Sequence, residues 1–100
     1  KTANTFKPQE NQLPLVSFAI PTLNNERTIE KCLRSIRTQD YPSVEIVIVD
    51  GYSQDRTVKI AHQFTSKIYM CVGPLGRCRQ LSIRESAGQI VALFDADIVL

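Results

Sequence analysis

The chain has 100 residues, which is enough for one small domain with a core of its own. Hydrophobic residues make up 43% of it and charged residues 22%, as is usual for a globular domain. The formal net charge of +2 is too small to predict a nucleic-acid partner or binding to a membrane surface. Residues 1–14 are polar, lack the apolar segment of a signal peptide and are expected to form a flexible leader, which leaves residues 15–100 as the domain.

The three cysteines, Cys32, Cys71 and Cys78, include no C-x-x-C pair. An odd number at this spacing argues against a disulfide scaffold and against a zinc site. We therefore expect buried thiols in a reducing compartment.

Apolar runs and helical stripes alternate along the chain from Leu15 onward. The runs are short and rich in β-branched residues, as in strands that are buried on both faces. Between them, apolar residues recur with the spacing of an amphipathic helix, for example at Ile29, Cys32, Leu33 and Ile36. Strands are predicted at residues 15–20, 44–50, 67–72 and 89–95, and helices are predicted after Asn25, after Ser53 and over residues 77–87.

Local sequence also predicts where these elements begin and end. Pro21 is expected to stop the first strand. Asn25 and Ser53 are expected to cap the first and second helices, since their side chains accept hydrogen bonds from free N–H groups of the first turn. Gly88 is expected just after the third helix, in the position that favours glycine. The third strand is the weakest and is expected near an edge of the sheet.

The order β-α-β-α-β-α-β predicts an α/β fold, a three-layer α/β/α sandwich, because strands joined through helices pair in parallel with right-handed crossovers. The expected strand order is 3-2-1-4, as in the Rossmann-like, nucleotide-binding half of doubly wound folds. Ligands of such sheets bind beyond the carboxyl ends of the strands, where the strand order reverses, here between the first and fourth strands. The residues expected near that point are Pro21, Thr22, Leu23, Asn24, Asn25, Glu26, Asp50, Gly51, Gly73, Gly76, Arg77, Arg79, Asp95, Ala96 and Asp97.

Two acids follow the fourth strand. In an extended segment Asp95 and Asp97 point to the same side, and Ala96 between them leaves room for a ligand. Paired carboxylates of this kind suit Mg²⁺ or Mn²⁺, although acids at a strand end can instead cap the next turn. Asp50 also has two interpretations, a ligand-facing acid or an Asx-turn before the next helix. Neither a G-x-G-x-x-G fingerprint nor a P-loop is present.

The segments IPTLN, VDGYSQD, GPLGRCRQ and DAD occur in the order and at the spacing of glycosyltransferase family 2. The chain resembles this family over about residues 15–100. The resemblance implies a GT-A fold and a transferase that uses a nucleotide-sugar donor. It also implies that residues 21–26 line the nucleotide, and that Asp50, followed by Gly51, lies near the base.

The same resemblance implies roles for the later motifs. Arg79, in the helix start that also contains Gly76, would lie near the diphosphate. Asp95-Ala96-Asp97 would be the DxD motif that binds Mg²⁺ or Mn²⁺, with Asp97 as the direct metal ligand. The metal would bridge the diphosphate and help the nucleoside diphosphate to leave.

Three positions depart from the family pattern. Leu23 replaces a frequent aromatic residue, so that stacking on the base is lost. Gly51 replaces a second acid, which in some members reads the uracil ring, and Gln80 replaces an asparagine. The identity of the donor nucleotide and of its sugar therefore stays open.

In this family the acceptor site and the catalytic base lie in the second half of the domain. The resemblance therefore predicts the donor-binding half of a longer enzyme, with an unknown acceptor and little transferase activity of its own. We expect a cytoplasmic location, or one at the cytoplasmic face of a membrane through other parts of the parent protein. We also expect self-association through the open edge of residues 89–95, because unpaired strand edges recruit other strands.

Two alternatives stay open. The first is a degenerate, non-catalytic nucleotide-binding domain, which the changes at Leu23 and Gly51 allow. The second is a receiver-type signalling domain with Asp50 as the phosphoacceptor. That class requires an acid pair after the first strand and a lysine after a later one, whereas residues 21–26 contain Glu26 as their one acid and no lysine ends the fourth strand.

Overall fold

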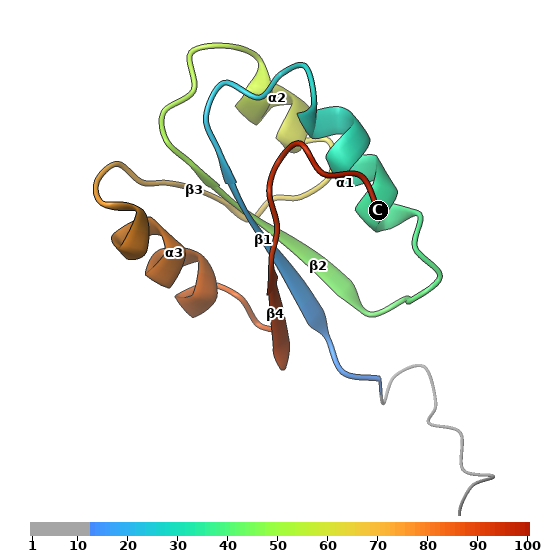
Figure 1. Ribbon diagram of the computed structural model, residues 1–100. Coiled ribbons are helices and arrows are strands. Elements are labelled where there is room, and N and C mark those ends of the chain that lie inside the picture. The colour runs from blue at the N-terminus through green and yellow to red at the C-terminus, as the bar shows by residue number, and fades with distance from the viewer. Residues whose placement is uncertain (1–12) are drawn as a thin grey trace, which may run out of the picture.

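The computed structural model describes residues 13–100 of the chain, so that nearly all of the predicted leader lies outside the described residues. Strands and helices alternate along the described part in the predicted β-α-β-α-β-α-β order (Figure 1). The elements are β1 (Val16–Thr22), α1 (Ile29–Arg37), β2 (Val44–Asp50), α2 (Thr57–Ala61), β3 (Ile68–Met70), α3 (Leu75–Arg84) and β4 (Ile90–Leu93).

The four strands form one parallel sheet in the order β3-β2-β1-β4, which confirms the predicted strand order. β1 and β2 are the central strands and pair along their whole length, from Val16 opposite Val44 to Thr22 opposite Asp50. β4 pairs only with the first part of β1, ending where Ala19 lies opposite Leu93. The carboxyl ends of β1 and β2 therefore extend beyond the end of β4.

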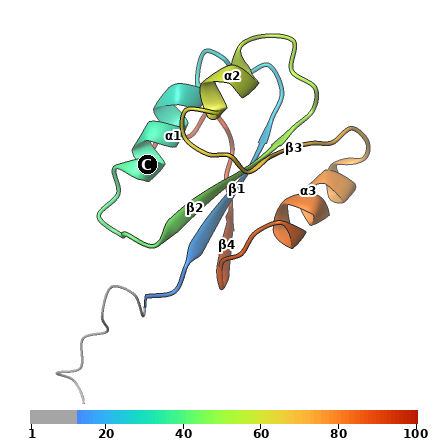
Figure 2. The same cartoon turned by 180° about the vertical axis from the view of Figure 1, so that it is seen from behind.

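Helices cover both faces of the sheet, so that the predicted three-layer arrangement is confirmed. α1 and α2 lie on one face and α3 lies on the other (Figures 1 and 2). The main core lies between the sheet and the two helices α1 and α2, where the apolar stripe predicted for the first helix is buried. This core consists of Ile20, Ile29, Cys32, Leu33, Ile36, Ile46, Ile48, Ala61 and Ala96.

The prediction that Pro21 stops the first strand is wrong, because β1 continues to Thr22. Alternate residues of a parallel strand direct their backbone groups to opposite neighbours. Thr22 accepts a hydrogen bond from Gly51 N–H on the β2 side, whereas Ala19 accepts one from Phe94 N–H on the β4 side. Pro21 therefore turns its missing N–H toward the β4 side, beyond the last residue pair of that ladder, where the loss costs no ladder hydrogen bond.

The predicted cap of α1 is also wrong. Asn25 turns its side chain back, so that Oδ1 accepts a hydrogen bond from Leu23 N–H at 2.8 Å. The backbone carbonyl of Asn25 accepts the N–H of Ile29 at 2.9 Å and thereby precedes α1 by one turn. Asn25 thus shapes the turn before the helix rather than its N-terminus.

The predicted cap of α2 by Ser53 is also wrong, and Asp55 shapes the turn that leads into the helix. Asp55 Oδ1 accepts hydrogen bonds from the N–H of Thr57 at 2.9 Å and from its Oγ1 at 2.5 Å. Desolvation raises the pKa of the Asp55 carboxyl, but these hydrogen bonds and one from Glu26 N–H together outweigh it and hold the pKa below its usual value. Ser53 is directed to Asp50 at the end of β2.

Gly88 does not occupy the predicted position after the third helix, because α3 begins at Leu75 and ends at Arg84. Its role is a close approach of the chain before β4 to the start of β1. Its N–H donates to Ser17 Oγ at 2.8 Å, and a Cβ atom at this position would lie 2.5 Å from that oxygen and 2.6 Å from Leu15 O. Only glycine fits here without displacing β1.

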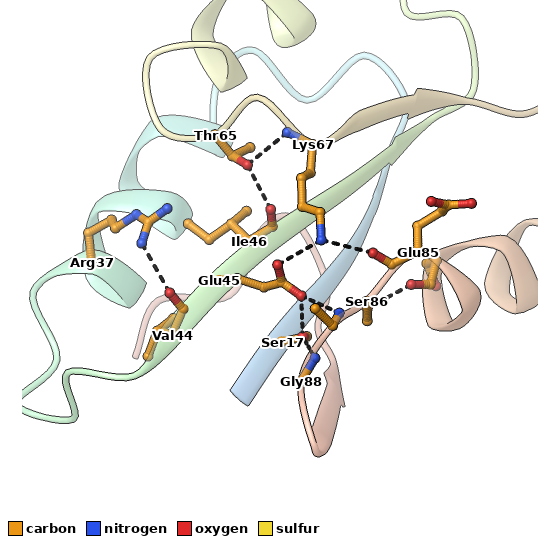
Figure 3. A network of polar contacts seen from close by, with 12 residues as sticks. Ser17, Arg37, Val44, Glu45, Ile46, Thr65, Lys67, Glu85, Ser86 and Gly88 are labelled. Atoms are coloured by element: carbon orange, nitrogen blue, oxygen red, sulfur yellow. Dashed lines mark hydrogen bonds and ion pairs between the residues drawn. The ribbon is translucent and has the colours of Figure 1, made fainter. Parts of the chain in front are cut away.

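Glu45 organises a polar network at the amino-terminal side of the sheet (Figure 3). Its carboxylate accepts hydrogen bonds from Ser17 Oγ at 2.5 Å, from Ala87 N–H at 2.6 Å and from Lys67 Nζ at 2.9 Å. Lys67 Nζ also donates to the carbonyl of Glu85 at 3.1 Å. The network therefore joins β1, β2, the segment before β3 and the chain between α3 and β4.

The surroundings of Glu45 shift its titration. Partial burial raises the pKa of the carboxyl, but the hydrogen bonds from Ser17, Lys67 and Ala87 and the charge of Lys67 lower it more, so that the net pKa lies below its usual value of 4.5. The hydrogen bond to Glu45 raises the pKa of Lys67 in turn. The ionised pair is thus favoured in the folded state.

β4 lies at an edge of the sheet, and among the described strands it has β1 as its single neighbour. Ile90 and Leu93 are about half exposed there, at 52% and 50%. The self-association expected through residues 89–95 stays a prediction. Within residues 13–100, none of the helices is long and apolar enough to span a membrane.

We predict that Glu45→Gln lowers the free energy of unfolding by roughly 1–2 kcal/mol near neutral pH, because charge-assisted hydrogen bonds are lost. The folded-state pKa of Glu45 is below the unfolded value of 4.5, so this contribution is present above that value and is lost as the pH falls through the folded pKa. Urea unfolding of both proteins at about pH 7 and about pH 3 should show the difference shrinking in acid. Glu30→Gln is the control, since Glu30 pairs with Arg34 on an exposed helix face. A difference of equal size at both pH values would contradict this assignment.

We predict that Gly88→Ala destabilises the fold by roughly 1–3 kcal/mol, because the added Cβ overlaps Ser17 and the carbonyl of Leu15. Gly76→Ala is the matched control. A Cβ at Gly76 has no atom within 4 Å and lies in α3, so this change should preserve or slightly raise stability. Chemical denaturation followed by circular dichroism measures both, and similar midpoints for the two variants would refute the close approach.

Candidate functional site

Two adjoining cavities lie at the carboxyl-terminal side of the sheet, where the strand order reverses. The larger has a volume of about 340 Å³ and the smaller about 220 Å³. They share Pro21 and Val49 from the central strands and Cys78 from α3. The larger is also lined by Thr22, Leu23, Asn25, Gly51, Cys71 and Gly73, and the smaller by Arg79, Ser82, Leu93, Phe94 and Asp95.

The structure brings about half of the predicted site residues to these cavities. Those in the walls are Pro21, Thr22, Leu23, Asn25, Gly51, Gly73, Arg79 and Asp95. Arg77 instead lines a separate hollow beside α3, together with Cys71, Gln80, Leu81 and Arg84. The predicted residues that line neither cavity are Asn24, Glu26, Asp50, Gly76, Ala96 and Asp97.

Asp50 holds the end of β1 against the turn that follows β2. Its side chain is fully buried. Oδ1 accepts hydrogen bonds from Thr22 Oγ1 at 2.5 Å and from Ser53 Oγ at 2.6 Å, and Oδ2 accepts the N–H of Ser53 at 2.6 Å. Of the two interpretations of Asp50, the structure favours the turn-forming one. Asp50 therefore supports the cavity from inside the protein, and its side chain is not accessible to a ligand.

Further hydrogen bonds join the β1 turn (residues 23–26) to the β2 turn (residues 51–57). Asn24 is central, because its N–H donates to Ser53 Oγ and its Oδ1 accepts the N–H of Gln54, both at 2.8 Å. Asn24 adopts a positive φ of 53°, a conformation that asparagine tolerates better than most residues. The side chain of Asn24 is therefore used within the protein.

The next residues of the β1 turn continue the same pattern. Asn25 N–H donates to Thr57 Oγ1 at 2.7 Å, and Glu26 N–H donates to Asp55 Oδ2 at 3.2 Å. Glu26 Oε1 accepts the N–H of Arg56 at 3.1 Å. The resemblance assigned residues 24–26 to the nucleotide. In the structure all three position the β1 turn, and Asn25 in addition lines the larger cavity.

The acidic pair after β4 lies in a turn instead of the extended segment expected. β4 ends at Leu93, and the N–H of Ile98 donates to the carbonyl of Asp95 at 3.2 Å. Ala96 is 5% exposed and packs in the core against α1. Asp95 and Asp97 are therefore not directed to the same side by the alternation of side chains along a strand, which requires an extended backbone.

The two acids have different surroundings. Asp95 lines the smaller cavity with Arg79. Asp97 lies near the thiol of Cys32 on α1, and burial together with the charge of Asp97 raises the pKa of that thiol to about 11. Both acids are exposed, and neither forms an ion pair with a described residue.

A divalent cation fits the chemistry of this acidic pair only with help from a ligand. Exposed carboxylates are hard oxygen donors of the kind that Mg²⁺ and Mn²⁺ prefer. In residues 13–100, however, no group of three His, Cys, Asp or Glu side chains is arranged to hold a metal ion. Mg²⁺ commonly takes one or two carboxylates and completes its shell with substrate phosphates and water. A phosphate-bearing ligand would therefore have to supply part of the coordination.

The expectation of three buried thiols is wrong for two of the cysteines. Cys71, just after β3, and Cys78, in α3, form a disulfide with Cα atoms 5.7 Å apart. Cys32 is buried and free, as expected. The two partners are not spaced as C-x-x-C, and they meet because the end of β3 and the start of α3 reach the same side of the sheet.

Sequence reasoning missed several residues of the cavity walls. Val49, Leu93 and Phe94 lie at strand ends, so the rule for parallel sheets was sufficient to include them. Ser82 projects from the second turn of α3, and no local pattern marks it. The cysteines could be found only through the fold.

Comparison with known proteins adds independent information. A model of glycosyl transferase family 2 matches residues 17–100. Glycosyltransferase AglE of Haloferax volcanii is 37% identical over 94 residues, which cover 85% of this chain and 31% of that protein. The mannosyltransferase PcManGT from Pyrobaculum calidifontis, solved with GDP-Man and Mn²⁺, is 28% identical with a TM-score of 0.77, and the match covers 93% of this chain and 30% of that one.

A second solved structure is glucosyl-3-phosphoglycerate synthase from Mycobacterium tuberculosis in complex with Mg²⁺ and UDP. It is 25% identical with a TM-score of 0.72, and the match covers 90% of this chain and 36% of that one. The chain thus spans about a third of the length of these relatives. The fold is of the GT-A type that these neighbours share.

We predict that Asp50→Asn lowers the free energy of unfolding by roughly 1–3 kcal/mol, because an amide cannot accept all three hydrogen bonds and turns N–H toward donors. The amide oxygen can still accept the hydroxyls of Thr22 and Ser53, but the NH2 group then faces the N–H of Ser53, which loses its acceptor. Asp40→Asn, at an exposed position after α1, is the control and should change stability by less than about 0.5 kcal/mol. Guanidinium unfolding measures both, and equal stabilities would remove Asp50 from its supporting role.

Proposed function

Because the chain belongs to glycosyl transferase family 2, we propose that it forms the part of a glycosyltransferase that binds the nucleotide-sugar donor. The observation that carries the proposal is the pair of adjoining cavities at the switch point of the sheet. All four motifs of the family resemblance contribute to their walls, through Pro21 and Thr22, Gly51, Arg79, and Asp95.

The nucleoside occupies the larger cavity in this proposal. Its walls combine the apolar side chains of Pro21, Leu23 and Val49 with the backbone of Gly51. Such a surface suits the flat faces of a base. Leu23 is 58% exposed and offers an apolar contact in place of aromatic stacking. These contacts do not decide between uridine and guanosine donors, which are the nucleotides in the two structural relatives.

The diphosphate lies toward the smaller cavity, at Arg79 and Asp95. The guanidinium of Arg79 is exposed and carries the charge and the planar donors that phosphate oxygens accept. Asp95 and Asp97 would hold Mg²⁺ or Mn²⁺ jointly with the diphosphate. When bound, such a cation neutralises charge on the departing nucleoside diphosphate.

The remaining functions of the enzyme are assigned to other parts of the parent protein. The chain spans about a third of the length of its relatives. We therefore propose that other parts of the whole enzyme bind the acceptor, supply the catalytic base and determine the location in the cell. A phosphoacceptor role for Asp50, the receiver-type alternative, is opposed by the full burial of its side chain.

We predict that the chain binds a nucleoside diphosphate more tightly with Mn²⁺ than without it, because the cation bridges the carboxylates and the phosphates. Titration calorimetry with UDP and GDP, each with and without MnCl₂, measures this. Asp95→Asn and Asp97→Asn should each weaken the Mn²⁺-dependent binding by at least about tenfold and leave the metal-free binding unchanged. Asp40→Asn, away from the cavities, is the control.

The outcomes separate the alternatives. Binding that does not respond to Mn²⁺ would remove the metal from the proposal and leave a metal-independent donor site. No binding of any nucleotide would favour the degenerate, non-catalytic domain.

A further inference from the structure

The Cys71–Cys78 disulfide forms part of the wall of the proposed nucleotide cavity. Cys71 and Cys78 both line the larger cavity, opposite Thr22, Leu23 and Gly51. Cys78 also lines the smaller cavity beside Arg79 and Asp95. The bond therefore lies where the two cavities meet, and the two half-buried cysteines border open space that a small reagent can enter.

The disulfide fastens a segment that has little else to hold it to the sheet. Cys71 is anchored, since its N–H donates to the carbonyl of Asp50 at 2.9 Å. After it, Val72, Gly73 and Pro74 are exposed, with Val72 at 64%. The described residues form no hydrogen bond between residues 72–74 and the sheet, and the carbonyl of Pro74 bonds within the start of α3.

The same segment determines the position of the basic residue of the site. It leads directly into α3, and Arg79 follows Cys78 by one residue. A covalent bond from Cys78 to the anchored Cys71 fixes the first turn of α3 relative to the ends of β1 and β2. Without this bond, the first turn of α3 would depend on the packing of the helix alone.

We propose that the Cys71–Cys78 disulfide is a thiol-sensitive latch on the donor cavity. In the oxidised chain it holds residues 72–78 against the sheet, so that the cavity is ready for the nucleotide. In the reduced chain this segment is released, the wall is incomplete for most of the time, and nucleotide affinity falls. The effect on affinity rests on the proposed function of the cavity, whereas the release of the segment does not.

The chemical step is a thiol–disulfide exchange with an external dithiol. A thiolate of the dithiol attacks one sulfur of the disulfide and forms a mixed disulfide, and the sulfur of the other cysteine leaves and takes up a proton. The second thiol of the reagent then displaces the first cysteine, which also becomes a thiol. Two electrons and two protons pass to Cys71 and Cys78, and the reagent becomes its own disulfide.

Cys32 does not compete with this pair. It is a residue of α1 and is fully buried in the core between that helix and the sheet, on the opposite face of the sheet from α3. In the oxidised chain, one thiol should react with a chromogenic disulfide, and only after denaturation. After reduction three should react, two of them in the folded chain.

The test compares nucleotide binding by the same chain in two redox states. The oxidised chain is titrated with UDP and with GDP in the presence of MnCl₂. A second sample is first reduced with dithiothreitol and then desalted under nitrogen, so that the reagent does not bind the metal. We expect reduction to weaken binding by about tenfold, as when the competent conformation is populated about a tenth of the time.

Two variants and one further measurement complete the design. Cys71→Ser combined with Cys78→Ser should bind like the reduced chain whether or not reductant is added. Cys32→Ala removes the third thiol, keeps the disulfide and should retain the full response. Hydrogen exchange of residues 72–78, read by mass spectrometry, should become faster on reduction, while that of β1 and β2 stays unchanged.

Each result decides a different claim. Equal affinities in the two redox states, with nucleotide bound in both, would overturn the latch and leave the proposed function intact. No nucleotide binding in either state would overturn the proposed function, and the exchange data then decide the latch. Unchanged exchange in residues 72–78, or three reactive thiols in the chain after mild oxidation, would overturn it.

Discussion

The carboxylate of Asp50 is the group on which the shape of the candidate site depends. It is fully buried and takes three hydrogen bonds, one from Thr22 at the end of β1 and two from Ser53 after β2. A buried carboxylate is tolerated only where such donors replace water. Separating the ends of the two central strands would leave this carboxylate buried without donors, which is energetically costly. The strand ends therefore stay together, and the β1 and β2 turns keep their positions above the sheet.

This arrangement leaves the two sides of the site with different chemistry. The side chains and amides of Asn24 and Glu26 are engaged between the turns, so the larger cavity presents mostly apolar side chains and backbone. Charged groups enter the walls from α3 and from the end of β4, as Arg79 and Asp95. A nucleotide has a similar distribution of polarity, since its base has flat, largely apolar faces and its phosphates are charged. The turns after β1 and β2 thus line the larger cavity together with the disulfide, whereas α3 and the segment after β4 supply the charged groups of the smaller cavity.

The sequence predicts the sheet and the side of it that carries the cavities, because continuous apolar runs and their order determine both. It does not predict the local geometry, which contacts between distant residues decide. Asn25 and Ser53 are of the residue types that often cap helices, but their side chains form other hydrogen bonds. Asn25 accepts the N–H of Leu23, and Ser53 bonds to Asp50 and to Asn24. The extended arrangement of the DAD motif is lost because Ala96 packs into the core and the chain turns after β4.

The position of the charged wall also depends on residues at the opposite end of the sheet. Arg79 lies in α3 and Asp95 just after β4. The chain that connects these two elements is held by Glu45, through Ala87, and by Lys67, through the carbonyl of Glu85. Gly88 lets this connection approach β1 closely, so that a side chain there would displace both elements. Two clamps therefore act on the same unit, a network of hydrogen bonds at its amino-terminal side and a disulfide near the site. Acid weakens the network, because its hydrogen bonds depend on the ionised carboxylate of Glu45, whereas the proposed latch responds to thiols, so that the two clamps are sensitive to unrelated chemical changes.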